Sequence, residues 1–210
     1  MSDQIHERTR EYYERKLAAH GASPAGVDWN SRASQELRFA QLATLWGQAR
    51  EASLLDFGCG YGALLHWLRA SGFTGPYIGF DLSAAMIKAA EAAAIDAGLS
   101  NWRFVPEQSN LARAELVVAS GIFNVRMDTP EAAWHDYMLA TIDELAALAI
   151  RGFAFNALSA YSDPEKQRHD LYYAEPLEIF DYCKQTHSPM VALLHDYPLY
   201  EFTIVVRRPE

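Results

Sequence analysis

The segment Leu54–Gly62, LLDFGCGYG, constrains the fold more than any other stretch of the chain. It follows a short apolar run and precedes a helical pattern, so three glycines stand where a strand passes into a helix. Glycine permits a tight turn there and leaves bare backbone against which a ligand can lie. The segment therefore predicts a strand–turn–helix unit that binds a ligand at Gly58, Gly60 and Gly62.

Short β-rich runs alternate with longer helical patterns from residue 53 onward, which is typical of a parallel sheet with helices on both faces. We expect strands near 53–57, 76–81, 102–106, 115–120 and 151–157, and helices near 61–71, 83–98, 131–149 and 176–185. Only Pro198 and Leu199 separate the last two β-rich runs, VALLHDY and YEFTIVVR, so these must pair antiparallel. The predicted class is α/β: a doubly wound, mainly parallel seven-stranded sheet with a C-terminal antiparallel hairpin.

Two further helical patterns, at residues 8–19 and 31–50, precede the first strand. A chain of 210 residues has the usual length of one domain. We therefore expect a single domain over 1–210, in which residues 1–50 form a helical lid or cap region and residues 51–210 form the core.

The net charge and the cysteine content limit which ligands and partners the chain can have. The chain carries 18 Lys and Arg against 27 Asp and Glu, and its net charge of −9 would repel a nucleic acid backbone. Cys59 and Cys183 belong to no CxxC pair, so we expect free thiols and no metal site. The charged N-terminal segment has no apolar run typical of a signal peptide or membrane span, which predicts a cytoplasmic protein with no membrane partner. The oligomeric state is left open.

The charge beside the glycine turn separates two classes of cofactor. Gly58, Gly60 and Ala63 also match the G-x-G-x-x-A pattern of dinucleotide-binding proteins, which place a pyrophosphate on the helix N-terminus. The carboxylate of Asp56 would repel a pyrophosphate and attract an ammonium group. S-adenosylmethionine carries an ammonium and a sulfonium but no phosphate, so the sequence favours it over NAD or NADP.

Asp81 lies at the end of the second predicted strand, about twenty residues beyond the glycines, where a carboxylate can accept hydrogen bonds from ribose hydroxyls in either cofactor class. The alternative is that Asp81 caps the next helix, although Ser83 suits that role better.

Three segments together, LLDFGCGYG, IGFDLS and VVASGIFN, resemble the successive motifs of class I, Rossmann-like S-adenosylmethionine-dependent methyltransferases. The closing hairpin is similar to the reversed seventh strand of that family, and the resemblance covers about residues 50–207. It implies a methyltransferase that uses S-adenosylmethionine and releases S-adenosylhomocysteine.

The resemblance also implies roles for individual residues. Asp56 and Gly58 would lie near the methionine portion of the cofactor, Asp81 on the ribose, Leu82 beside the adenine, and Ser120 and Gly121 beside the sulfonium. The family often has an acidic residue on the adenine amine after the third strand. Here Glu107 or Gln108 could replace it, and we favour the side-chain carbonyl of Gln108.

Methyl transfer from a sulfonium depends chiefly on holding the acceptor in line, so a general base is optional. Asn124 follows the fourth strand and either contacts the acceptor or organises a turn. His195 either acts as a base or has a structural role in the hairpin. His169, Tyr172 and Tyr173, in the loop 159–175, either contact the acceptor or face solvent.

Residues 1–50 supply the remaining candidates. Tyr12, Tyr13 and Trp29 either form an aromatic lid over cofactor or acceptor, or belong to the core. Arg38 either grips a carboxylate of cofactor or acceptor, forms a salt bridge to a local acid, or extends its head group to water.

The sequence thus predicts transfer of a methyl group to an O or N atom of a small molecule. The alternatives are an NAD(P)-dependent Rossmann oxidoreductase, for which Asp56 is unfavourable, and a non-catalytic protein that binds S-adenosylmethionine.

Overall fold

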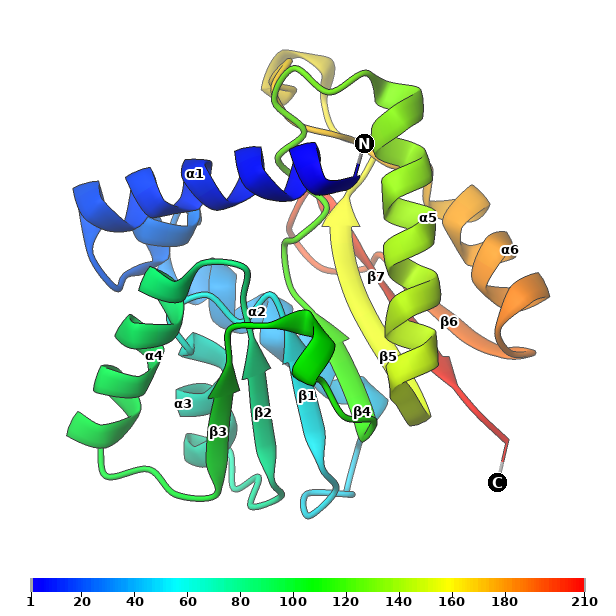
Figure 1. Cartoon of the computed structure of the whole chain (residues 1–210). Coiled ribbons are helices and arrows are strands. Elements are labelled where there is room, and N and C mark those ends of the chain that lie inside the picture. The colour runs from blue at the N-terminus through cyan, green and yellow to red at the C-terminus, as the bar shows by residue number, and fades with distance from the viewer. Residues whose placement is uncertain (1, 210) are drawn as a thin grey trace.

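A seven-stranded sheet with the order β3-β2-β1-β4-β5-β7-β6 forms the centre of the computed structural model, which describes residues 2–209 (Figure 1). The strands are β1 Leu54–Phe57, β2 Tyr77–Phe80, β3 Trp102–Val105, β4 Ala114–Ala119, β5 Ala149–Leu158, β6 Met190–Leu194 and β7 Glu201–Arg207. Strands β1 to β5 are parallel, and β7 pairs antiparallel with both β5 and β6. The predicted fold class, including the terminal hairpin, is confirmed.

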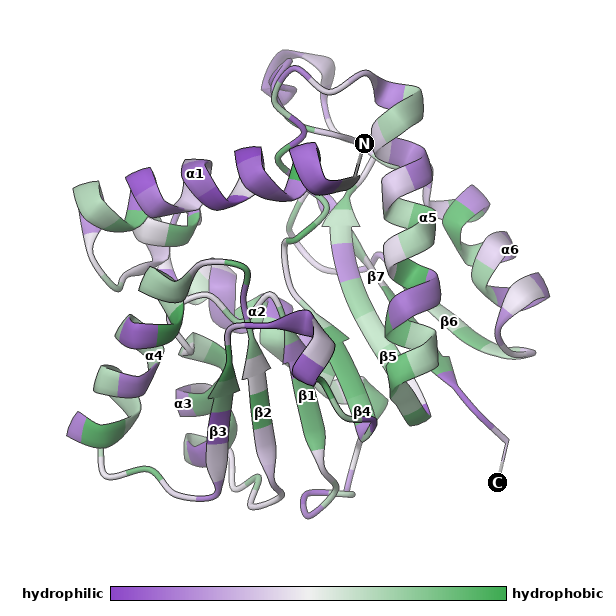
Figure 2. Cartoon of the chain, viewed as in Figure 1, coloured by the Kyte–Doolittle hydropathy of each residue, from purple (hydrophilic) through white to green (hydrophobic). Residues whose placement is uncertain are grey.

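Six α-helices accompany the sheet in the described residues: α1 Ser2–His20, α2 Arg32–Leu42, α3 Ala63–Ala70, α4 Ala84–Asp96, α5 Glu131–Leu148 and α6 Pro176–Thr186. Apolar side chains of α5 and α6 pack on one sheet face, and those of α2, α3 and α4 pack on the other. Strands β1 and β4 are buried on both faces because helices cover both sides, and they are correspondingly apolar in Figure 2.

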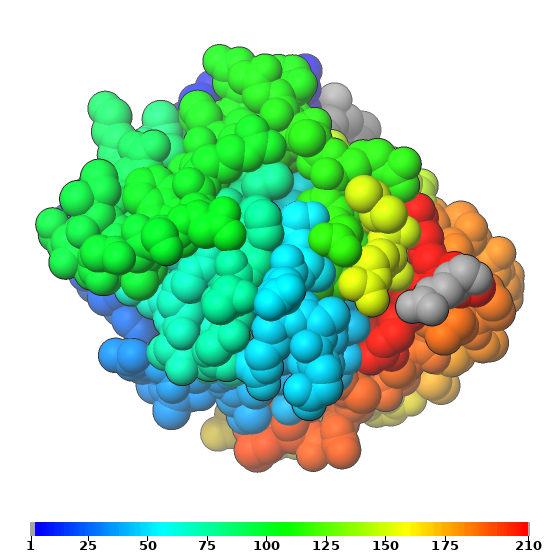
Figure 3. Space-filling view, turned by 90° about the horizontal axis from the view of Figure 1, so that it is seen from below, coloured from blue at the N-terminus to red at the C-terminus, as the bar shows by residue number. Residues whose placement is uncertain are grey.

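Helix α1 differs from the others because it covers neither face of the sheet. It lies across the carboxyl ends of the strands and is mostly hydrophilic (Figures 1 and 2). At the opposite edge, seen in Figure 3, the start of β5 lies beside the end of β7, in agreement with the pairing of Gly152 with Arg207. Any site at the carboxyl ends therefore lies beneath α1.

Two predicted elements are shorter in the structure than in the sequence pattern. The helix expected over 31–50 ends at Leu42 and continues only as a 3-10 turn over Ala43–Leu45, before Gly47 adopts a φ of 52°. The hairpin strands end at Leu194 and begin again at Glu201, because Pro198 has no backbone N–H for a ladder.

Candidate cofactor and acceptor cavities

One cavity is lined by residues of α1 and by residues at the carboxyl ends of β1, β2 and β4. We call it the strand-end cavity. It is lined by Thr9, Arg10, Tyr13, Val27, Trp29, Phe57, Gly58, Gly60, Phe80, Asp81, Leu82, Met86, Ser120, Gly121, Ile122 and Tyr137. The predicted Gly58, Gly60, Asp81, Leu82, Ser120, Gly121 and Tyr13 are therefore brought together.

The glycine turn needs its glycines for two different reasons. Gly58 and Gly60 have φ values of 83° and 54°, in the left-handed region that favours glycine. A Cβ atom on Gly58 would lie 2.4 Å from the Cγ2 atom of Ile122, on the opposite wall of the cavity. Gly62, with a φ of 81°, begins α3 and lies against Ala90 of α4, so it serves helix packing and does not line the strand-end cavity.

The carboxyl group of Asp56 is buried beside this turn. It lines a recess together with Gly58, Gly60 and Ser120, which also line the strand-end cavity. Its one side-chain hydrogen bond in the described structure comes from the hydroxyl of Tyr77, at 2.7 Å. Burial raises the pKa of Asp56 to about 7, although the Tyr77 hydrogen bond opposes this shift. The group therefore has room for a further donor, which a cationic ligand can supply.

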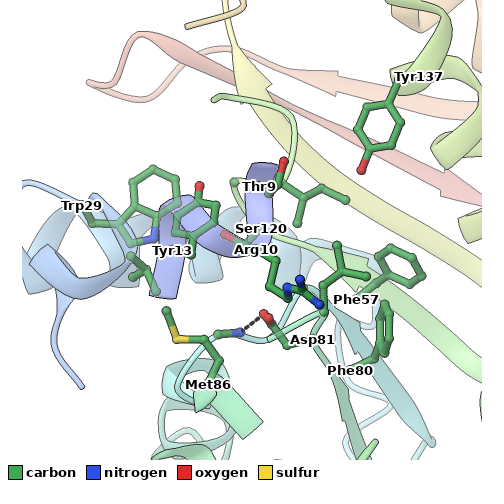
Figure 4. Close-up of a pocket in the computed structure, with 16 residues that line it drawn as sticks. Thr9, Arg10, Tyr13, Trp29, Phe57, Phe80, Asp81, Met86, Ser120 and Tyr137 are labelled. Carbon is green, nitrogen blue, oxygen red and sulfur yellow. Dashed lines mark hydrogen bonds between the residues drawn. The ribbon is translucent and has the colours of Figure 1, made fainter. Parts of the chain in front are cut away.

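Asp81 is held by the backbone at both carboxylate oxygens. Oδ2 accepts a hydrogen bond from Gly60 N at 2.9 Å, drawn as a dashed line in Figure 4. Oδ1 accepts one from Ser83 N, also at 2.9 Å. Burial raises the pKa of Asp81 to about 6, and the two backbone hydrogen bonds partly offset the shift. The Ser83 hydroxyl accepts from Met86 N and caps α4, as the sequence suggested.

Helix α1 contributes Thr9, Arg10 and Tyr13 to the cavity wall. Arg10 extends from α1 toward Asp81, and Tyr13 lies beside Trp29 (Figure 4). The Thr9 hydroxyl oxygen is buried and has no hydrogen-bond partner within residues 2–209. Of the aromatic lid candidates, Tyr13 and Trp29 line the cavity, whereas the Tyr12 hydroxyl donates to Asp28, at 2.8 Å.

A second cavity adjoins the first, and we call it the loop cavity. The two share Tyr13, Val27, Trp29 and Gly121. The rest of its wall is Asp28, Asn30, Arg38, Asn124, Val125, Leu158, Ser162, Lys166, Arg168, Leu171, Tyr173, Pro198, Leu199, Tyr200 and Glu201. Most of these belong to the segments 27–38, 158–173 and 198–201, which the sequence pattern did not bring together.

Arg38 forms a buried ion pair across the molecule. Its Nε and Nη2 atoms donate to the two carboxylate oxygens of Glu201 at 2.7 and 2.6 Å, and its guanidinium lies 3.8 Å from the ring centre of Trp29. The salt-bridge alternative thus describes Arg38, but the acid is 163 residues away in sequence and not local. This pair holds Trp29 where the two cavities meet.

Asn124 and Tyr173 line the loop cavity, and the Asn124 Oδ1 also accepts from Leu158 N at 3.3 Å. His195 is exposed near the rings of Tyr161 and Phe202 and lines neither cavity.

The other candidates from the sequence also lie outside both cavity walls. The Gln108 amide donates to Glu144 of α5. His169 lines neither cavity, and the Tyr172 hydroxyl lies 3.0 Å from Nδ1 of His135.

Several wall residues were missed from the sequence. Thr9 and Tyr13 are four residues apart on α1 and therefore lie on the same face of the helix. Helical spacing from the predicted Tyr13 would therefore have identified Thr9 as a second wall residue. Lys166 and Arg168 lie in the loop 159–175, which the sequence did indicate, but no local pattern singled them or Asp28 out, because only the tertiary fold brings their segments to one wall.

Comparison with known proteins identifies the family. A family model described as "Methyltransferase domain" matches residues 29–149. A protein of Mycobacterium tuberculosis (strain ATCC 25618 / H37Rv) named "Putative methyltransferase Rv1506c" is 50% identical over 156 residues, which are 74% of this chain and 93% of that protein. The chain therefore belongs to the methyltransferase-domain family.

Solved structures define the fold within that family. The N-methyltransferase NodS from Bradyrhizobium japonicum WM9, in complex with S-adenosylhomocysteine, has a TM-score of 0.68 at 17% identity, over 96% of this chain and 99% of NodS. The DhpI–S-adenosylhomocysteine complex has the same TM-score at 15% identity and covers 98% of both chains. The fold is that of the class I, Rossmann-like S-adenosylmethionine-dependent methyltransferases, as the sequence motifs implied, and membership of the methyltransferase-domain family overturns the oxidoreductase alternative.

Proposed function

We propose that the protein transfers the methyl group of S-adenosylmethionine to an O or N atom of a small molecule, and that the two cavities hold the donor and the acceptor respectively. The observation that carries this proposal is the adjacency of the two cavities, which share Tyr13, Trp29 and Gly121. Direct transfer requires donor and acceptor to meet at one opening.

The strand-end cavity suits S-adenosylmethionine chemically. Asp56 has a single donor partner and can accept a hydrogen bond from the ammonium group. The oxygens of Asp81 are aimed by Gly60 and Ser83 and retain lone pairs for ribose hydroxyls. Phe80, Leu82 and Met86 offer an apolar wall for the adenine. When bound, the cofactor supplies an already activated methyl group.

The residues of the protein then position the acceptor and exclude water. Helix α1 covers the donor site with Thr9, Arg10 and Tyr13, and Trp29 is fixed by the Arg38–Glu201 pair at the boundary. Asn124 would orient the acceptor from the wall of the loop cavity. The role of His195 as a base stays a prediction. His195 lines neither cavity, so its position does not favour that role.

The wider predictions belong to the same proposal. A single domain over 1–210, a cytoplasmic location and the absence of a nucleic acid partner stay predictions. Among the described residues no helix is long and apolar enough to cross a membrane.

Calorimetry with S-adenosylhomocysteine tests the donor site. We expect one molecule to bind per chain with micromolar affinity or better, and Gly58→Val to abolish binding because its side chain would meet Ile122. Gly98→Val, at an open position with a similar φ of 62°, is the matched control. A protein that binds the cofactor but methylates no member of a broad acceptor panel would favour the non-catalytic alternative.

A further inference from the structure

The loop cavity differs in charge from the rest of the protein. Its wall carries three cations, Arg38, Lys166 and Arg168, and two carboxylates, Asp28 and Glu201, although the whole chain has a net charge of −9. An excess of positive charge in an acidic protein favours an anionic occupant.

The two carboxylates are already neutralised. The carboxylate of Glu201 accepts hydrogen bonds from Nε and Nη2 of the Arg38 guanidinium. Asp28 is bonded by Lys16 at 2.5 Å and by the Tyr12 hydroxyl at 2.8 Å, and an Arg168 nitrogen lies 3.6 Å from it. Partial burial alone would raise the pKa of Asp28, but the hydrogen bonds from Lys16 and Tyr12 lower it below its usual value. Neither carboxylate is suited to remove a proton from an acceptor.

Lys166 is the cation of this wall that lacks an anionic partner. Within residues 2–209, no carboxylate lies within 4.0 Å of its ammonium, whereas Arg38 pairs with Glu201 and Arg168 pairs with Asp170. The described wall also contains no histidine. A neutral alcohol or an ammonium ion must lose a proton in the course of methylation, and the described wall has no unpaired carboxylate or histidine to take it.

We infer that the acceptor brings its own negative charge, as a small-molecule oxyanion such as a carboxylate that Lys166 binds in the loop cavity. An oxyanion is already deprotonated, so one of its oxygens can form the new bond to the methyl carbon directly. The bond from that carbon to sulfur breaks, its electron pair stays on sulfur as a neutral thioether, and no proton is transferred. The product is a methyl ester. This inference rests on the proposed function, because it assigns the acceptor of the same site.

Matched probes test the charge of the acceptor. The full-length protein is first saturated with S-adenosylhomocysteine. Calorimetry then compares the affinities of phenylacetate, phenylacetamide and phenethylamine. These probes share an aromatic ring, which suits a wall that contains Trp29, Tyr173 and Tyr200. We expect phenylacetate to bind about tenfold more tightly than the amide, which is typical of a charge-assisted hydrogen bond. Benzylphosphonate forms a further arm, and its preference over phenylacetate would keep the oxyanion but assign it to a phosphoryl group.

Lys166→Met should remove the preference for the anion and leave S-adenosylhomocysteine affinity unchanged. Lys88→Met, at an exposed position on α4, is the matched control and should alter neither. With S-adenosylmethionine present, mass spectrometry of a turned-over acid should show a gain of one methyl group as a base-labile ester.

Equal binding of phenylacetate and its amide, preferential binding of phenethylamine, or an unchanged preference in Lys166→Met would each overturn the inference. S-adenosylhomocysteine binding in the same samples separates this failure from failure of the proposed function.

Discussion

The two cavities are adjacent but are built in different ways. The glycine turn, Asp81 and the Ser120–Gly121 corner of the strand-end cavity all come from the carboxyl ends of parallel strands, where open α/β sheets bind ligands. The loop cavity also reaches the ends of β4 and β5, through Asn124 and Leu158, but most of its wall comes from the segments 27–38, 159–173 and 198–201, which connect the elements of the sheet. In the proposed function, the sheet therefore supplies most of the donor site, and the connecting segments supply most of the acceptor site.

The charges differ in the same way. Asp56, in the recess beside the strand-end cavity, and Asp81, on the wall of that cavity, form no salt bridge within residues 2–209, and burial raises the pKa values of both carboxyl groups. In the loop cavity Asp28 and Glu201 are each paired with cations. The first site is prepared to receive a positive charge, and the second already contains its counterions.

The largest expected effect concerns the buried pair of the loop cavity. Glu201→Ala would leave the Arg38 guanidinium buried without its partner, and we expect a loss of about 3–5 kcal/mol in the free energy of unfolding. Urea denaturation measures this loss. The double variant Arg38→Met, Glu201→Leu should recover most of it, because no charge is then buried. Affinity for S-adenosylhomocysteine should fall by less than about tenfold in the folded double variant, because the pair supports Trp29 but does not itself line the strand-end cavity. A larger fall would show that the sites are not separate.

The converse change, in the strand-end cavity, should reduce affinity more than stability. We expect Asp81→Asn to weaken S-adenosylhomocysteine binding by about 1.5–3 kcal/mol, roughly 10- to 150-fold, because hydrogen bonds to a charged acceptor are replaced by weaker ones. Asp96→Asn, at the exposed end of α4, is the control and should bind normally. Unaltered binding in Asp81→Asn would remove Asp81 from the ribose site.

The same contrast explains which parts of the candidate site could be predicted from the sequence. The glycine turn, Asp81 and the Ser120–Gly121 corner follow strands that local patterns identify, and parallel strands bring their ends to one edge. The sequence therefore located the strand-end cavity.

Contacts made through tertiary packing were not predictable in this way. Glu201 begins β7 and meets Arg38 only because β7 inserts between β5 and β6, an order that the alternation of elements does not specify. Gln108 turns toward Glu144 of α5, and His195 lies in a turn that the predicted strand extents had placed inside the hairpin.

The pH dependence of binding tests the role of Asp56. Its pKa in the free protein is raised to about 7, so protonation stabilises the folded free state, and this contribution is lost as the pH rises through about 7. A bound ammonium group requires the ionised form of Asp56, so binding of the cofactor favours ionisation of Asp56 where the free protein favours its protonation. Affinity for S-adenosylhomocysteine should therefore rise up to tenfold per pH unit below about 7 and level off above it. Calorimetry from pH 5.5 to 8.5 measures the slope.

Asp56→Asn should bind more weakly at pH 8 and should lose the change in slope near pH 7. A weaker dependence below about pH 6 should persist in this variant, because Asp81 still titrates there. An identical pH profile in the variant would mean that Asp56 does not meet the ammonium.

The smallest effect should come from the helix that covers both sites. The ammonium of Lys16 and the hydroxyl of Tyr12 attach α1 to Asp28, on the wall of the loop cavity, while Tyr13 on the same helix lines both cavities. A partly exposed ion pair contributes about 0.5–1 kcal/mol. Lys16→Met should therefore speed the release of S-adenosylhomocysteine about two- to fivefold in stopped-flow measurements, whereas Arg15→Met, whose Glu11 partner lies at 4.0 Å on the exposed face of α1, should not. Equal release rates in both variants would mean that α1 does not open when the cofactor leaves, and the donor would then have to enter through the loop cavity.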